Sequence, residues 1–595
     1  MRLTTSSALL ALATVSSATA RILSPTDDDY VAALATTNRF CPVQCATEIF
    51  QPESTADLAA WMRTERSKHN HITVKGSGHS YGCQSVPRDG GMMIHTALLN
   101  KAEVVKRANG TAFARLGAGL NFQDVVPQLN SMGYLMPHGE CITVGLAGYH
   151  LNTGGHPETD NWSRFYGDQP FLSKMTAVDY DGNVFTIDDK GLTYLDPSPN
   201  MDASARNVRK ELTQALGDQL ELALAQGPSG VEPAASSTLR LMQNYGANLI
   251  VATEFEIELV PRSEPDYFLI TYPVALVVAD VNLVQALVDF MFGVDEEELS
   301  CGIVFMTDAL PGNVDGISLK CMDWQGRGRA FLAQQVPVGY KSLKRVPYSG
   351  FFVWNKDSYG LGWTPQFFVE PVALFNAASG VEKWRQIILA MSRPDSPCTS
   401  CMLELNRGPG LYYNDMMCGA EGAGQDQCSD FTYEQQASLL GERPNFYKRN
   451  LPSCRANPRW QPENLGYGLL YPLAQQLKQA WDSGGVVDFW LGINHEDNDK
   501  ACEATHVQEI GATCKAHGIT ALDLVAAVRN DATSRCAKVY KYPSTTEQNT
   551  KCAMKWERCA TSLKIIDEGA SKSRKGKSGK GKIKKGKRGK TGKCG

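Results

Sequence analysis

The sequence predicts an α+β protein with two domains in series. Its 595 residues exceed what one hydrophobic core normally organises, and 43% of them are hydrophobic, as in a globular protein. The first half alternates short β-type runs with glycine-rich loops, whereas residues 265–480 mix strands with longer helices. We therefore expect one domain over residues 41–262 and a second, with an antiparallel sheet and helices, over residues 265–480. Residues 481–560 are expected to return to the first domain.

Two helices are expected in the first domain. Ser54–Asn70 carries apolar residues on one side, and Thr55 is its expected N-cap. A second helix should be capped by Asp124, tolerate Pro127 in its first turn and stop at Gly133.

Strands are expected between and after these helices. "HITVK" (His71–Lys75) leads into a glycine loop, and the strands "GMMIHTALLN" and "TAFARLGAG" follow. "SKMTAVDYDGNVFTID" is a hairpin that turns at Asp181–Asn183, and "NLIVATEFEIELVP" is a long strand ended by Pro261. In the second domain, "DYFLITYPVALVV" is expected to be a strand. Strand, glycine loop, strand, strand and helix in this order indicate an α+β or α/β domain that holds a ligand.

The two ends of the chain differ from its body. Residues 1–20 have one Arg, a short apolar run and Ala18-Thr19-Ala20, which is typical of a secretory signal peptide cleaved before Arg21. Residues 569–595 form a low-complexity tail that we expect to be disordered. Because residues 571–595 hold twelve Lys or Arg and no acid, a net charge of −4 leaves −16 on the rest. An acidic body argues against nucleic-acid binding, while the tail either binds a polyanion or only aids solubility.

Cysteine usage agrees with secretion. In an oxidising compartment, the spacings Cys41/Cys45 and Cys398/Cys401 indicate disulfides rather than zinc ligands, and we expect no metal site. The total of seventeen is odd, so one cysteine should have another role, and Cys141 is the candidate. Asn109-Gly-Thr and Asn161-Trp-Ser are possible glycosylation sequons.

Two glycine-rich stretches point to a bound cofactor. "VKGSGHSYGC" (Val74–Cys83) follows a strand, and "HGECITVGLAGYHLNTGGH" (His138–His156) sets Cys141 ahead of a second glycine run. Glycines let the backbone approach a ligand and present N–H groups to phosphates. The Rossmann fingerprint is absent, because Gly117-Ala118-Gly119 lacks a third glycine that opens a helix.

The first stretch resembles the Arg-Gly-Gly-Gly-His-Ser-Tyr loop of FAD-linked oxidases of the p-cresol methylhydroxylase and vanillyl-alcohol oxidase type. "HGECITVGLAG" resembles the Gly-x-Cys-x-x-Val-Gly-x-Gly-Gly segment of their berberine-bridge-like and carbohydrate-oxidase branch, and "NLIVATEFEIELVP" resembles a strand of that family. The resemblance covers roughly residues 41–262. It implies an FAD-binding domain in two parts, with the second domain holding the substrate over the flavin ring.

By this resemblance, His79 bonds to the flavin 8α carbon and Cys141 to ring carbon C6. A neutral imidazole and a soft thiolate are nucleophiles suited to these positions. Cys141 has two competing readings, since it also suits a disulfide and Cys83 could take its place at the flavin. The full set of expected FAD-binding residues is Lys75, Gly76, Ser77, Gly78, His79, Ser80, Cys141, Thr143, Val144, Gly145, Gly148, Val251 and Thr253.

The sequence departs from the family at several points. Lys75 replaces an arginine, Ile250 replaces a glycine, and Pro157 interrupts the second glycine run. The family's Tyr-Gly-x-Asn-Tyr segment, which supplies a tyrosine near the flavin, is not found. His495, at the end of "VVDFWLGINHED", is a candidate for the base that takes the hydroxyl proton, and equally suits an ordinary loop position.

The resemblance implies a secreted, FAD-dependent oxidase. It would oxidise an alcohol or a sugar hemiacetal and pass the electrons to molecular oxygen, giving hydrogen peroxide. The branch also oxidises alkaloids and aromatic alcohols, and a dehydrogenase with another acceptor stays open. The alternative is a catalytically degenerate flavoprotein scaffold that acts at an extracellular matrix through its basic tail.

Overall fold

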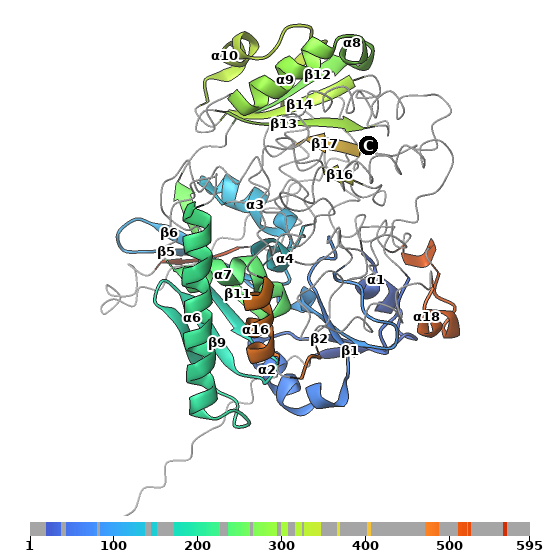
Figure 1. The fold of residues 1–595 in the computed structure, drawn as a ribbon, viewed down its shortest axis with the longest axis vertical. Helices are drawn as coiled ribbons and strands as arrows, with labels where there is room; N and C mark the ends of the chain where they lie inside the picture. The colour runs from blue at the N-terminus through green and yellow to red at the C-terminus, as the bar shows by residue number, and fades with distance from the viewer. Residues whose placement is uncertain are drawn as a thin grey trace, which may run out of the picture.

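The described residues of the computed structural model fold into three β-sheets with helices packed on them (Figure 1). The structure describes residues 20–36, 43–79, 84–136, 138, 144–151, 172–226, 236–261, 266–293, 299–306, 316–323, 326–346, 366–368, 402–405, 471–482, 484–486, 510–520, 522–524, 527 and 563–567. Within these ranges, no helix has both the length and the apolar composition required to cross a membrane.

The first sheet has the strand order β1-β2-β4-β3. Its strands are β1 (Arg21–Leu23), β2 (Glu48–Gln51), β3 (Ile72–Lys75) and β4 (Met92–His95), and β2, β4 and β3 run parallel. Helix α2 (Thr55–Thr64) connects β2 to β3 and buries Leu58 against their core. The expected N-cap is wrong by one residue, since Ser54 accepts from the Asp57 N–H at 3.1 Å. Ser54 has the extended backbone that a cap needs, which leaves Thr55 inside the first turn.

The second sheet has the order β10-β9-β8-β11-β6-β5-β18, and β7 pairs with β11 beside it. Its strands are β5 (Ala102–Lys106), β6 (Ala112–Gly117), β7 (Tyr134–Leu135), β8 (Leu172–Val178), β9 (Val184–Asp188), β10 (Gly191–Asp196), β11 (Val251–Pro261) and β18 (Lys564–Asp567). The expected hairpin is present as β8 and β9, and Gly182 in its turn has a φ of 79°. Strand β11 alternates buried and half-buried residues, so one face meets the core while the other carries ion pairs such as Arg107–Glu258 at 2.7 Å.

Helix α3 (Phe122–Ser131) follows β6, and its N-cap lies three residues before the expected cap at Asp124. Asn121 is its N-cap, and Asp124 closes a capping box by accepting from the Asn121 N–H at 2.9 Å. Asp124 is therefore the third helical residue, which also moves Pro127 beyond the first turn. Gly133 follows the helix with a φ of 79°, as its expected stop requires.

The third sheet has the order β15-β12-β14-β13-β17-β16 and is antiparallel except for the β16–β17 pair. Its strands are β12 (Asp266–Pro273), β13 (Leu299–Met306), β14 (Gly316–Asp323), β15 (Ser342–Val346), β16 (Gln366–Phe368) and β17 (Met402–Leu405). Helices α8 (Val274–Ala279) and α9 (Val281–Gly293) cover one face of it, at the top of Figure 1. The strand expected over 266–278 thus ends at Pro273, because proline lacks the N–H that would extend the ladder and suits the start of a helix.

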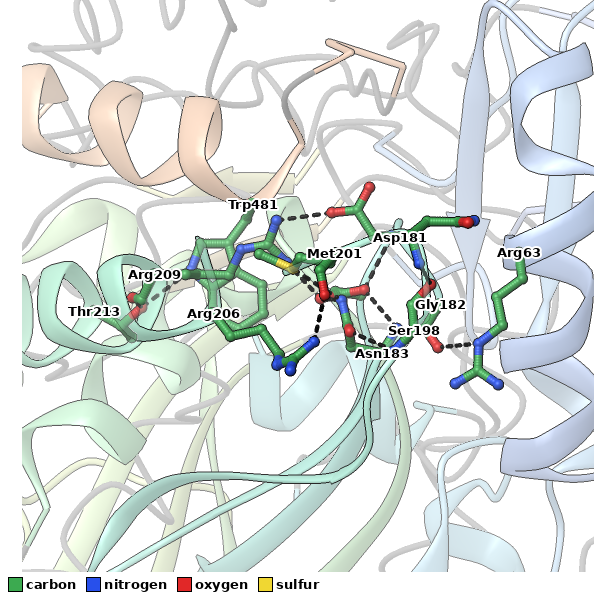
Figure 2. A network of polar contacts seen from close by, with 12 residues as sticks. Arg63, Asp181, Gly182, Asn183, Ser198, Met201, Arg206, Arg209, Thr213 and Trp481 are labelled. Atoms are coloured by element: carbon green, nitrogen blue, oxygen red, sulfur yellow. Dashed lines mark hydrogen bonds and ion pairs between the residues drawn. The ribbon is translucent and has the colours of Figure 1, made fainter. Parts of the chain in front are cut away.

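Two helices from distant parts of the sequence lie side by side next to the second sheet. Helix α16 (Tyr471–Trp481) packs along α6 (Ala203–Gln226), and the Trp481 indole donates to the Thr213 hydroxyl at 3.1 Å (Figure 2). The Arg209 guanidinium lies over the same indole and pairs with Asp179 and, at 2.8 Å, with Asp181. A buried ionic network therefore joins α6 to the turn of the β8–β9 hairpin.

Residues near the C-terminal end also attach to the first half of the chain. Cys45 forms a disulfide with Cys514 in α18 (Ala512–Ala516), and Thr513 N–H donates to the Asp89 carboxylate at 3.1 Å. Cys45 is thus in a disulfide rather than a zinc site, but the expected pairing with Cys41 is wrong, because its partner Cys514 lies 469 residues away in the sequence. Strand β18 then pairs in parallel with β5 at the edge of the second sheet. Cys398 and Cys401 lie outside the described residues.

Candidate functional site

Three backbone segments meet at the boundary of the first two sheets. They are the histidine loop (Lys75–His79) at the end of β3, the Gly117–Asn121 turn at the end of β6, and the Val144–Gly148 segment that opens α4 (Leu146–Leu151). The last two are joined by hydrogen bonds from Phe122 N–H to the Val144 carbonyl at 3.1 Å and from Leu146 N–H to the Leu120 carbonyl at 2.9 Å. The Gly117–Asn121 turn therefore lies next to the second glycine-rich stretch.

Glycine permits the closest contact between these segments. A Cβ atom on Gly145 would lie 2.9 Å from the Ser77 hydroxyl oxygen and 3.0 Å from its backbone nitrogen, so no side chain fits there. Gly148 is different, because it is exposed and a Cβ atom there would meet nothing within 4 Å. Gly76 stands opposite it, with 3.8 Å between a Cβ atom on Gly76 and the Gly148 nitrogen. The segments thus form a bare backbone edge of the kind that approaches a phosphate or a flat ring closely.

The Gly117–Asn121 turn also contacts neighbouring backbone closely through its glycines. Cβ atoms on Gly117 and Gly119 would each lie 2.1 Å from a carbonyl oxygen, those of Leu99 and Thr96 respectively. The Thr96 hydroxyl lies 3.4 Å from the carbonyl oxygens of both Lys75 and Ala118. These glycines therefore serve close backbone packing, which brings the turn to the site without the Rossmann geometry that their spacing fails to match.

The Lys75 side chain points away from the bare edge. It is 2% exposed, and its ammonium donates to the carbonyl oxygens of Ala33 and Ala35, at 2.6 Å each, at the C-terminal end of α1 (Tyr30–Leu34). A cation at a helix C-terminus satisfies carbonyls that the helix leaves open. Gly78, with a φ of 80°, lets the loop fold back over this side chain, since a Cβ atom there would lie 2.8 Å from Lys75 Cε. Lys75 therefore ties the histidine loop to the N-terminal segment.

His79, at the end of this loop, is held neutral. Burial, and secondly the positive charge of Lys75, lower the pKa of the His79 imidazole to about 3. Charging the ring would place a second cation beside a buried ammonium in a poorly solvated position. At neutral pH the His79 ring therefore keeps a free-base lone pair, which is the form of imidazole that acts as a nucleophile.

A group of aromatic rings in mutual contact lies next to the Val144–Gly148 segment. Phe122 contacts the rings of Tyr149 and His138 edge-on, at centroid distances of 4.9 and 5.8 Å. His150 packs between Tyr149 and Phe255, and burial lowers its pKa to about 3. These rings fix the direction of α4 and hence the position of the bare edge.

The structure brings most of the expected residues together. Gly76, Ser77, Gly78, His79, Val144, Gly145 and Gly148 meet as described above. Thr253 reaches the site through its backbone, because its carbonyl accepts from Ala118 N–H at 3.0 Å, while its hydroxyl contacts Thr55 at 2.9 Å. The Val251 side chain lies in the core beneath α2 instead. Ser80, Cys141, Thr143 and His495 lie outside the described residues, as do Cys83 and Asn161.

Sequence reasoning missed Gln51, His95 and Thr96. Gln51 ends β2 and His95 ends β4, two strands that run parallel to β3 in the same sheet, and Thr96 follows His95 directly. The signal was present in "GMMIHT", where a histidine and a threonine interrupt an apolar strand at its carboxyl end. Ligand-binding groups gather at that end of parallel strands.

Comparisons with known proteins find relatives of the part of the chain that contains this site. A family model described as FAD binding domain matches residues 46–188. Among curated proteins, bifunctional decalin synthase calF of Penicillium decumbens is 31% identical over 104 residues, which is 17% of this chain and 18% of that protein. FAD-linked oxidoreductase easE of Claviceps purpurea is 31% identical over 145 residues, which is 23% of this chain and 29% of that protein. The chain thus matches less than a third of the length of either relative.

Solved structures share the fold over most of the chain. Xylooligosaccharide oxidase from Myceliophthora thermophila has a TM-score of 0.51 at 13% identity, and the match covers 80% of this chain and 97% of that one. 6-Hydroxy-D-nicotine oxidase from Arthrobacter nicotinovorans has a TM-score of 0.53 at 17% identity, covering 82% and 100% of the two chains. BBE-like 1 of Physcomitrella patens has a TM-score of 0.52 at 14% identity, covering 80% and 98%.

The family model indicates an FAD-binding domain over residues 46–188, and the solved oxidases above share the fold of this chain. The fold shared with xylooligosaccharide oxidase and BBE-like 1 agrees with the p-cresol methylhydroxylase type of FAD-binding fold that the sequence predicted. The residues present fit the cofactor, because a backbone edge bare of side chains suits a pyrophosphate and a neutral histidine suits a reactive flavin ring.

Proposed function

We propose that this protein is a secreted oxidase that oxidises the CH–OH group of an alcohol or a sugar hemiacetal and reduces molecular oxygen to hydrogen peroxide. The observation that carries the proposal is the contact of the histidine loop, which ends in a neutral His79, with the Val144–Gly148 segment. Xylooligosaccharide oxidase has the same fold, which supports a sugar or oligosaccharide as the first substrate class to test.

Each part of the site has one task in this proposal. Gly76–Gly78 and Val144–Gly148, together with Ser80 and Thr143, hold the FAD pyrophosphate and the edge of the flavin. His79 and Cys141 would each form a covalent bond to the flavin, replacing a C–H bond of the flavin and losing the proton of the imidazole or thiol; the two electrons left on the ring by each bond would pass to oxygen. The bound FAD would supply a hydride acceptor for the substrate that oxygen can reoxidise. Among the chain's own residues, His495 is the candidate that takes the proton from the substrate hydroxyl.

The nucleophile at position 79 is the best-supported part of this chemistry. With its pKa near 3, the ring offers a lone pair at any physiological pH without a separate base to deprotonate it. The odd number of cysteines independently favours Cys141 as the second attachment point, since disulfides consume cysteines in pairs.

The covalent linkage has a direct test. The purified protein should be yellow and should stay yellow after precipitation with trichloroacetic acid. His79→Ala should keep its flavin through Cys141, and Cys141→Ala through His79, each with a changed absorption spectrum, while the double variant should release its FAD. Release of all FAD from the unmodified protein by acid refutes the covalent assignment.

The oxidase activity is tested by a peroxide assay on a panel of sugars and alcohols, with an artificial electron acceptor as a second arm. Peroxide formed in proportion to substrate supports the oxidase. Turnover only with the artificial acceptor identifies a dehydrogenase. Bound flavin without any turnover favours the alternative, a flavoprotein scaffold.

Secretion receives support from the first sheet and from a glycosylation sequon. The first described strand begins at Arg21, directly after the expected signal peptide. Asn109 is exposed at the tip of the β5–β6 hairpin, where its side-chain oxygen accepts from the Thr111 hydroxyl at 2.7 Å. We propose N-glycosylation at Asn109 and test it by a mass shift on glycosidase treatment that Asn109→Gln abolishes.

A further inference from the structure

Three polar side chains end three neighbouring parallel strands behind the histidine loop. Gln51 ends β2, His95 ends β4 and Lys75 ends β3, and the register pairs Lys75 with His95. All three are buried, with exposed fractions of 6%, 9% and 2%. Buried polar groups normally hydrogen-bond, so their partners show what they hold in place.

The partners of His95 fix its protonation state. The Gln51 side-chain amide nitrogen lies 3.1 Å from His95 Nδ1. An amide NH₂ group only donates, so Nδ1 accepts and carries no proton. The ring also hydrogen-bonds to the backbone of Gly76. The single proton of a neutral ring is then on the other nitrogen and is donated to the Gly76 carbonyl.

The next residue holds the adjacent peptide. The Thr96 hydroxyl lies 3.4 Å from the carbonyl oxygen of Lys75, directly before Gly76. His95 and Thr96, at the end of β4, therefore contact the consecutive carbonyls of Gly76 and Lys75 at the start of the histidine loop. Gly76 itself has no side chain to anchor it, so its peptide depends on such outside contacts.

We propose that His95, oriented by Gln51, is a positioning residue that fixes the Gly76 peptide and thereby aligns His79 for attachment to the flavin. The proposal rests on the proposed covalent flavoprotein and adds a residue pair outside its binding motifs. His95 does not touch the flavin in this scheme. It acts through the Gly76 carbonyl, and a misaligned loop slows attachment because the nucleophile spends less time in the reactive geometry.

The test compares His95→Leu with His95→Gln in the full-length protein. Each is produced in a flavin-limited host, its flavin-free fraction is incubated with FAD, and the flavin that resists acid precipitation is followed with time. Leucine fills the space without a donor, and we expect attachment about tenfold slower, the factor that one lost hydrogen bond gives. Glutamine keeps a donor and should restore the rate to within about threefold of the unmodified protein.

The matched control is His71→Leu. His71 directly precedes the first residue of β3 and is half-buried. Its variant therefore measures how the loss of a histidine next to the same strand affects stability and the attachment rate. Thermal stability is measured for all variants. A purely structural role lowers the melting temperature of His95→Leu and leaves its attachment rate equal to that of His71→Leu, which overturns the proposal.

Two other results, a variant that does not fold and a protein that never attaches FAD, have defined consequences. If His95→Leu does not fold, Gln51→Leu replaces it, because the loss of the amide frees the ring to turn and should also slow attachment. Normal attachment in Gln51→Leu overturns the proposal. If the unmodified protein binds FAD but never attaches it, the covalent function fails first, and the role of His95 falls with it.

Discussion

Flavin attachment at His79 should be almost independent of pH between 5 and 8. Only the neutral imidazole can attack an electrophilic carbon, so the rate follows the fraction of uncharged ring. A histidine with the ordinary pKa of 6.5 would be roughly 3% neutral at pH 5, whereas a ring with a pKa of about 3 is about 99% neutral there. The difference between the two cases is about thirtyfold at pH 5.

The perturbation that tests this reasoning is Lys75→Gln. Glutamine keeps a donor for the Ala33 and Ala35 carbonyls but removes the positive charge beside His79. Because burial is the larger cause of the low pKa and Lys75 the second, the pKa of His79 should rise in the variant without reaching its ordinary value. Attachment should therefore begin to slow at a higher pH than in the unmodified protein.

The assay is the acid-stable flavin formed with time in Cys141→Ala, which leaves His79 as the only attachment point. Rates are measured from pH 4 to 8 with saturating FAD, and circular dichroism at each pH confirms that the protein stays folded. Lys75→Arg, which keeps the charge, is the control and should behave like the unmodified loop. A rate that falls with a midpoint near pH 6.5 in Cys141→Ala would refute the argument that burial and Lys75 hold His79 neutral.

Three further perturbations follow from the described contacts. Arg209→Met should cost about 3–5 kcal/mol of unfolding free energy, since it leaves the Asp179 carboxylate buried without its partner, and Arg206→Met, whose side chain is partly exposed, should cost far less. Burial raises the pKa of Asp179, and Arg209 opposes that rise. The loss of unfolding free energy in Arg209→Met should therefore become smaller as falling pH protonates this carboxyl in the folded state. A loss that stays constant with pH in urea titrations contradicts this expectation. The double variant Cys45→Ala/Cys514→Ala should lose about 2–5 kcal/mol, and an unchanged melting temperature would show that the 510–520 segment docks without its disulfide. Truncation after Gly569 should leave the melting temperature unchanged and abolish salt-sensitive retention on a sulfated resin; retention that survives truncation excludes the tail as a polyanion-binding segment.

Much of the fold was readable because its signals are local. The β8–β9 hairpin, the strand ended by Pro261 and the stop at Gly133 each follow from residues within a few positions of the feature. The glycine runs were also readable, since glycine clusters after a strand have few structural uses besides close backbone approach. The one-residue error at Ser54 and the shift of α3 to Asn121 arose because neighbouring residues were equally good caps, and only the backbone conformation chose between them.

The sequence by itself determined which residue types the site contains, a histidine in a glycine loop and a cysteine ahead of another. Tertiary structure decided what surrounds them. The Lys75 ammonium, expected among the cofactor contacts, turns to the end of α1 because two open carbonyls there satisfy it better than a solvent-facing position. His95 lies beside the histidine loop because β4 pairs with β3, and Cys45 forms a disulfide with Cys514, 469 residues away in the sequence. Such contacts depend on which segments are neighbours in space, and local patterns in a single sequence do not predict these neighbours.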